Sequence, residues 1–244
     1  MEIDTHIDAL ARDGELFVAS AARTGPDAPV PSCPEWKVRD LVGHLGGVHR
    51  WATTHVAERR TEMAPWVGDP GIADDELIEW FQDGHRTLVA TLRGADPDLE
   101  CFTFLPATSS VAFWARRQAH ETAIHRVDAE QAVGIATAFD PAFAADGVDE
   151  LVMAFAPTPR ARVDAPERRV LAVAATDAEG RWLIGLGPDG ADARRGGGDA
   201  DCEVSGPASD LYQLLWNRVR VEDTGVAVGG DTGLVDRWRD SLKV

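Results

Sequence analysis

Cysteine is scarce in this sequence: only Cys33, Cys101 and Cys202 occur among 244 residues. They are odd in number and widely spaced, and no two form a CxxC motif. This excludes a disulfide framework, a thioredoxin-like active site and a zinc ribbon. Basic residues are also few, with 24 lysines and arginines against 41 aspartates and glutamates, so the net charge is −17. An acidic surface repels phosphate backbones and anionic lipids, which argues against nucleic acids and membrane surfaces as partners.

Long apolar runs are missing as well. No stretch approaches the roughly 18 apolar residues that a membrane-spanning helix requires. The first residues, Met1–Asp8, are acidic and lack the apolar core of a secretory signal peptide. We therefore expect a cytoplasmic protein. Hydrophobic residues make up 44% of the chain, which is enough for the core of one large domain or two small ones.

Helical periodicity dominates the first part of the chain. Apolar residues recur at helical spacing in four long segments, which predicts helices over residues 4–23, 36–60, 74–93 and 110–133. Prolines keep residues 24–34 out of a helix. Gly46 inside the second helix costs about 1 kcal/mol relative to alanine, so we expect a close neighbour or a kink there. A fifth helix follows over 141–155. These elements predict an up-down four-helix bundle as the first domain, residues 1–156.

The pattern changes after Ala156. Residues 157–159 have the composition of a linker. Beyond them the sequence predicts strands over 169–176, 182–186, 202–205 and 226–228, and helices over 208–218 and 231–242. Residues 177–180 form a hairpin turn, and the Gly-, Asp- and Arg-rich residues 189–201 are expected to be an exposed loop. The second domain, residues 157–244, is therefore a small α+β unit, and the fold class of the whole chain is α+β.

Two helical segments about 75 residues apart carry the residues with the clearest chemistry. The first holds His44 and His49, and the second holds His120, Glu121 and His125. At about 100° per residue, Glu121 and His125 lie within about 40° of each other on one helix face, whereas His120 and His125 are about 140° apart. The string from His120 to His125 is therefore not an HExxH metalloprotease motif, because its histidines are one residue too far apart.

The same geometry allows only one of His44 and His49 to face a common ion. His44 lies beside the apolar stripe that faces the bundle interior, so it is the preferred ligand. His44, Glu121 and His125 would form a three-ligand site with an open fourth position, the arrangement of a catalytic zinc. Asp128 is placed to orient a ligand imidazole.

A simpler interpretation of the same residues is also open. His44 and His125 would then be hydrogen-bonded core histidines, and Glu121 would pair with Arg117 or Arg116. A Glu-x-x-x-His pair on one helix is common, so spacing alone does not decide between the two.

Three stretches resemble a known family. They are residues 31–51 (PSCPEWKVRDLVGHLGGVHRW), residues 116–128 (RRQAHETAIHRVD) and residues 204–218 (VSGPASDLYQLLWNR). Together they resemble the mycothiol-dependent maleylpyruvate isomerase family, a group of DinB-like four-helix bundles with a small C-terminal domain. The resemblance covers most of the chain.

The resemblance implies a site and a cosubstrate. Position by position, the ligands of zinc or another divalent metal fall on His44, Glu121 and His125, the same three residues that helix geometry selects. Mycothiol is the implied thiol cosubstrate. The C-terminal domain of the family contributes an arginine to the active site, for which Arg218 is the candidate catalytic residue and Arg220 the alternative.

These expectations lead to a mechanism in which a metal-activated thiol adds to an electrophilic carbon, either for cis–trans isomerisation or for S-transfer. Trp36 and Arg117 are the candidate cofactor-binding residues, Trp36 as a pocket wall and Arg117 as a cation for carboxylates. The alternatives are a metal-binding bundle without catalysis and an interaction protein with a degenerate site. We expect a monomer or a homodimer with small-molecule ligands.

Overall fold

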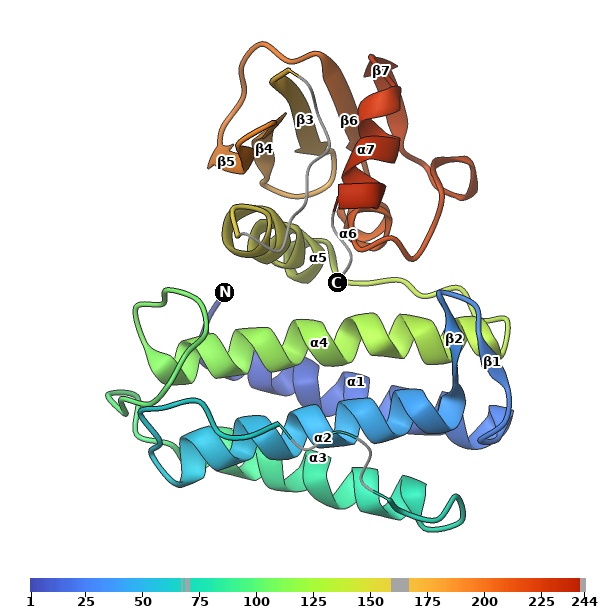
Figure 1. The fold of residues 1–244 in the computed structure, drawn as a ribbon, viewed down its shortest axis with the longest axis vertical. Helices are drawn as coiled ribbons and strands as arrows, with labels where there is room; N and C mark the ends of the chain where they lie inside the picture. Colours follow the sequence, from blue (N-terminus) through green and yellow to red (C-terminus); the bar gives the residue numbers. More distant parts are fainter. Residues whose placement is uncertain (67, 69–70, 159–166, 242–244) are drawn as a thin grey trace. The chain divides into compact units, whose positions relative to one another are not determined.

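The computed structural model describes residues 1–66, 68, 71–158 and 167–241. The chain divides into two compact units, Met1–Thr137 and Ala138–Val244. The first unit is helical and the second is mixed, which confirms the α+β fold class (Figure 1). Among the described residues, none of the helices is both long and apolar enough to cross a membrane.

The first unit is a four-helix bundle with a small hairpin (Figure 1). Its elements are α1 (Ile3–Thr24), β1 (Pro29–Val30), β2 (Cys33–Lys37), α2 (Val38–Ala57), α3 (Leu77–Gly94) and α4 (Ser110–Ala132). The hairpin was not predicted, since residues 24–34 were expected to be a turn and α2 to begin near Trp36. Pro34 cannot continue a helix, and the strand formed by residues 33–37 pairs antiparallel with residues 29–30.

Helix α4 packs mainly against α1 and also contacts α2. Ser109 caps its first turn by accepting a hydrogen bond from the Ala112 backbone N–H. Its buried residues include the polar side chains of Arg117, His120, His125, Asp128 and Glu130. Burying a polar group costs free energy unless it is paired, so the packing of α4 depends on specific polar contacts.

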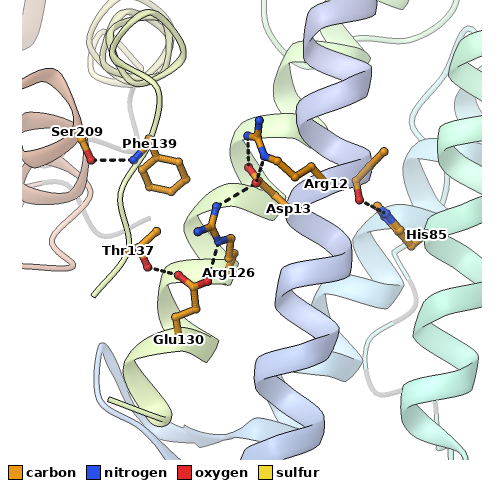
Figure 2. Close-up of polar contacts among 9 residues, drawn as sticks. Arg12, Asp13, His85, Arg126, Glu130, Thr137, Phe139 and Ser209 are labelled. Atoms are coloured by element: carbon orange, nitrogen blue, oxygen red, sulfur yellow. Dashed lines mark hydrogen bonds and ion pairs between the residues drawn. The ribbon is translucent and has the colours of Figure 1, made fainter. Parts of the chain in front are cut away.

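One such group of contacts joins α1 to the C-terminal end of α4 (Figure 2). Arg126 Nη1 donates to Asp13 Oδ1 at 3.1 Å, and its Nε donates to Glu130 Oε1 at 2.9 Å. Arg12 Nε also donates to Asp13 Oδ1, at 2.9 Å, and Thr137 donates to Glu130. Asp13 is completely buried and Glu130 is nearly so. The Arg126 guanidinium therefore pairs with both buried carboxylates, and Arg12 adds a second cation beside Asp13.

A close approach explains Gly46 in α2. A Cβ atom at this position would overlap the ring of Trp80 on α3. The predicted close neighbour is thus the Trp80 indole, which also stacks under the Arg50 guanidinium at 3.8 Å from the ring centroid.

Among its described residues, the second unit contains a five-stranded sheet and five helical segments. The sheet has the order β5-β4-β3-β6-β7, in which β3 and β6 are parallel and all other neighbours are antiparallel. The strands are β3 (Arg169–Ala175), β4 (Arg181–Gly187), β5 (Gly190–Arg195), β6 (Cys202–Gly206) and β7 (Ala227–Gly230). The helical segments are α5 (Pro141–Glu150), the π-helical η1 (Leu151–Phe155), α6 (Ala208–Leu215), η2 (Val221–Asp223) and α7 (Gly233–Ser241).

Two features of this unit differ from the sequence prediction. Residues 190–195, expected to be part of an exposed loop, form the edge strand β5, because an edge strand needs no apolar face. The domain boundary predicted after residue 156 lies instead before α5, at Thr137. Helix α5 belongs with the second unit because Phe139 and Phe143 pack on Tyr212 of α6, with ring centroids 5.3 and 6.3 Å apart. The predicted linker, residues 157–159, ends outside the described residues.

Candidate metal centre

The structure brings His44 of α2 together with Glu121 and His125 of α4. Glu121 Oε1 lies 3.4 Å from His44 Nε2 and 3.3 Å from His125 Nε2. One ligand atom from each of the three residues lies within 4.8 Å of the other two. Two imidazole nitrogens and one carboxylate oxygen thus point to a common place in the first unit.

The other two histidines of these segments point elsewhere, as the helical geometry requires. His49 is completely buried, and its Nε2 lies 2.9 Å from Thr122 Oγ1. Burial lowers the pKa of His49 well below its usual value, and the neighbouring His85 lowers it further. His120 packs edge-on against His6 of α1, with ring centroids 5.9 Å apart. Neither belongs to the cluster around Glu121.

His125 is held from behind by a carboxylate. Its Nδ1 lies 2.8 Å from Asp128 Oδ2, so Nδ1–H donates to Asp128 and Nε2 faces Glu121. The other Asp128 oxygen accepts a hydrogen bond from Ser32 Oγ, which lies in the β1–β2 turn, at 2.5 Å. Such a carboxylate fixes both the tautomer and the orientation of an imidazole whose second nitrogen binds a metal.

The charges within the cluster are strongly coupled. Burial opposes ionisation of Glu121, but hydrogen bonds from His125 and His44 outweigh it and hold the pKa of Glu121 well below its usual value. Burial likewise disfavours charge on His125, yet hydrogen bonds to Asp128 and Glu121 raise its pKa to about 9. In the metal-free protein the cluster therefore holds a proton on His125, which an incoming cation has to displace.

The predicted arginines occupy different surroundings. Arg117 is almost completely buried, and its Nη2 donates to Glu121 Oε2 at 3.1 Å. The Glu121–Arg117 pair that the simpler interpretation predicts is therefore present. It uses only one Glu121 oxygen, and the other oxygen faces His44 and His125. Arg218 lies in the second unit, half-buried, and donates to the Trp216 carbonyl at 2.7 Å. Arg220 is exposed.

Aromatic rings cover the cluster. The Trp36 ring centroid lies 4.9 Å from that of His44 and 6.2 Å from that of His125, in a stacked arrangement with the latter. The Trp66 ring centroid lies 6.0 Å from that of His44. Sequence reasoning singled out Trp36 but missed Trp66 and Ser32, because both lie in irregular segments where no periodicity indicates direction.

Comparison with known proteins gives a consistent result. The model of the mycothiol maleylpyruvate isomerase N-terminal domain matches residues 7–130, and the model of the C-terminal domain (MDMPI) matches residues 142–237. The crystal structure of the mycothiol-dependent maleylpyruvate isomerase superimposes with a TM-score of 0.62 at 12% identity, covering 94% of this chain and 93% of that one. A histidine-to-alanine mutant of that enzyme gives a TM-score of 0.61 at 14% identity, with the same coverage. A search of curated proteins finds no match.

Proposed function

Since this chain belongs to the mycothiol maleylpyruvate isomerase family, we propose that it is a metal- and mycothiol-dependent enzyme that acts on a small electrophile. The reaction is either a cis–trans isomerisation or an S-transfer. The observation that carries this proposal is the convergence of His44, Glu121 and His125 on one point.

The donor set fits a divalent metal. Ligands about 2.1 Å from a tetrahedral ion are about 3.4 Å apart, and the two separations measured from Glu121 Oε1 are 3.3 and 3.4 Å. Two imidazoles and one carboxylate suit zinc and also iron, nickel or cobalt. A bound divalent ion would lower the pKa of a coordinated thiol and so supply a thiolate at neutral pH.

The side chains around the cluster have separate roles in this proposal. Asp128 keeps His125 Nδ1 protonated and leaves Nε2 as the ligand atom, while Arg117 orients the Glu121 carboxylate. Trp36 shields the site from water and forms a wall for the thiol. Arg218 is proposed to hold a substrate carboxylate, for which a guanidinium offers two parallel hydrogen bonds.

Isomerisation by this route regenerates the thiol and consumes no other reactant. The thiolate adds to one carbon of the C=C bond of an unsaturated keto acid, and the electron pair moves onto the conjugated carbonyl. The former double bond is then single and rotates. Reversal of the addition expels the thiolate and leaves the trans isomer. In S-transfer the adduct is instead protonated, and the sulfur is retained.

Asp128 offers a test of the ligand geometry. Asp128→Asn places an amide opposite two donors, His125 Nδ1–H and Ser32 Oγ–H, and its NH₂ group cannot accept from either. We expect the affinity for zinc to fall about 10- to 100-fold, measured by competition with a chromogenic chelator. Ser32→Ala is the matched control, with a smaller loss because His125 keeps its carboxylate. Wild-type affinity in Asp128→Asn would show that His125 is not held for metal binding.

The proposed function is tested by removing each component in turn. Purified protein should contain about one divalent ion per chain, the stoichiometry of a three-ligand catalytic site. Consumption of maleylpyruvate, or of another electrophile from a panel, should require both this metal and mycothiol and should stop after chelation. Metal content without thiol-dependent turnover would favour the non-catalytic metal-binding protein. Absence of metal under all loading conditions would contradict both the metal-dependent enzyme and the non-catalytic metal-binding protein.

A further inference from the structure

A cavity of about 590 Å³ adjoins the metal cluster in the first unit. His44 is part of its wall, so a ligand in the cavity lies next to the proposed coordination site. The side chains that give the cavity its chemical character come from β2, the start of α2 and the segment leading to α3. They are Glu35, Trp36, Arg39, Asp40, Trp66 and Asp74.

Two of these side chains are indoles next to the same metal ligand. Trp36 and Trp66 lie 4.9 and 6.0 Å from His44 between ring centroids, and 49% of Trp66 is exposed. Trp66 therefore presents apolar ring surface to solvent in the wall of the cavity. Indole faces pack well against the apolar C–H faces of saturated rings, and their N–H groups remain available to polar atoms.

The charged groups of the cavity are mostly acceptors. Among the described residues that line it, three are carboxylates, Glu35, Asp40 and Asp74, and one is a guanidinium, Arg39. Arg39 Nη2 already binds Asp27 at 2.7 Å and Asp74 at 2.9 Å. Glu35 is exposed and forms no hydrogen bond or ion pair with any residue that the structure describes. The cavity therefore offers hydrogen-bond acceptors and excess negative charge.

A ligand for such a cavity has to donate hydrogen bonds and carry no negative charge. Hydroxyl groups donate to carboxylates in short, charge-assisted hydrogen bonds. A carboxylate-bearing ligand would instead meet like charges in a partly desolvated space, which costs binding free energy. Aromatic walls with carboxylate acceptors thus favour a polyhydroxylated ring system over an anion.

We propose that this cavity binds the neutral, hydroxyl-rich pseudodisaccharide part of the thiol cosubstrate, with the sulfur directed towards His44, and that its carboxylates exclude anionic thiols. This inference rests on the proposed function, because it takes the cosubstrate from there. Glu35 and Asp74 act as acceptors for the ligand hydroxyls, and Trp36 and Trp66 pack against the rings. The cavity therefore determines which thiol reaches the metal.

Three thiols separate the contributions of the cavity. Mycothiol carries the polyol and the thiol, N-acetylcysteamine is a neutral thiol without the polyol, and glutathione is an anionic thiol. Their affinities for the zinc-loaded protein are measured by isothermal titration calorimetry, so that the readout is binding and not turnover. Wild-type protein should bind mycothiol more tightly than either of the other two.

The double variant Glu35→Gln, Asp74→Asn removes two carboxylates from the cavity without touching the metal ligands. We expect mycothiol to bind about five- to tenfold more weakly, the effect of losing one or two charge-assisted hydrogen bonds. The affinity for N-acetylcysteamine should not change. Glutathione should bind several-fold more tightly at low salt, and this gain should shrink as salt screens the charges. Glu100→Gln, an exposed acid that does not line this cavity, is the matched control and should behave as wild type with all three thiols.

The outcomes distinguish this inference from the proposed function. If the double variant has wild-type zinc content and wild-type affinity for both mycothiol and glutathione, the cavity assignment is wrong while the proposed function stands. Equal wild-type affinities for mycothiol and N-acetylcysteamine would also overturn it. If the zinc-loaded wild type does not bind mycothiol at all, the cavity assignment and the proposed function are both wrong.

Discussion

His125→Gln is expected to abolish metal binding and to reduce thiol-dependent turnover by at least about 10³-fold, since a catalytic metal contributes several kcal/mol to transition-state stabilisation. The substitution removes the Nε2 atom that lies 3.3 Å from Glu121 Oε1. It also removes the donor to Asp128. Two ligands, His44 and Glu121, are too few to retain a catalytic ion. Metal content is measured by elemental analysis after gel filtration, and turnover with saturating mycothiol.

His120→Gln is the matched control for this prediction. His120 lies on the same helix and is also buried, but it faces His6 and not Glu121. Both variants lose a buried imidazole, so a general loss of stability would affect them alike. We expect only His125→Gln to lose the metal. The ligand assignment fails if His120→Gln loses the ion and His125→Gln keeps it.

The cluster could be predicted from the sequence to the extent that helix geometry determines direction. Spacing on α4 places Glu121 and His125 on one face and turns His120 away. In the structure Glu121 contacts His125, and His120 packs against His6. Spacing does not state which helices are neighbours. His44 was selected because it lies beside the apolar stripe of α2, and the family resemblance pointed to the same residue. Ser32 could not be found in this way. It lies in a turn, 96 positions from Asp128, and no periodic pattern connects the two residues.

The individual helices and strands were predicted more accurately than their assignment to the two compact units. Periodicity shows that residues 141–155 are helical. It does not show whether their apolar face packs in the core of the first unit or of the second. The contact of Phe143 with Tyr212 decides this, and it depends on tertiary packing. Strand β5 was missed for a related reason. It lies at the edge of the sheet, and its charged residues have the composition of a loop.

The burial of Asp13 on α1 and of Glu130 on α4 was not predicted from the sequence. A helix that packs on several sides cannot be divided into an apolar and a polar face, so its charges have to be compensated one by one. Arg126 does this for Asp13 and Glu130, at 3.1 and 2.9 Å (Figure 2). The bundle that positions the metal ligands therefore depends on a guanidinium with no proposed role in the chemistry.

Arg126→Met is accordingly expected to destabilise the protein by about 3 kcal/mol, because removing one partner of a buried ion pair leaves the other charge uncompensated. The loss lies at the lower end of the usual range, since Arg12 still donates to Asp13 and Thr137 to Glu130. Arg86→Met is the matched control. Arg86 pairs with Asp83 on the surface of α3, where both side chains are more than half exposed, so its loss should cost no more than about 1 kcal/mol. Urea denaturation followed by far-UV circular dichroism measures both variants. Equal urea midpoints for the two variants would mean that Asp13 and Glu130 do not depend on Arg126. A lower midpoint for Arg126→Met, with unchanged zinc stoichiometry in the folded state, would show that Arg126 stabilises the bundle without taking part in the chemistry of the metal centre.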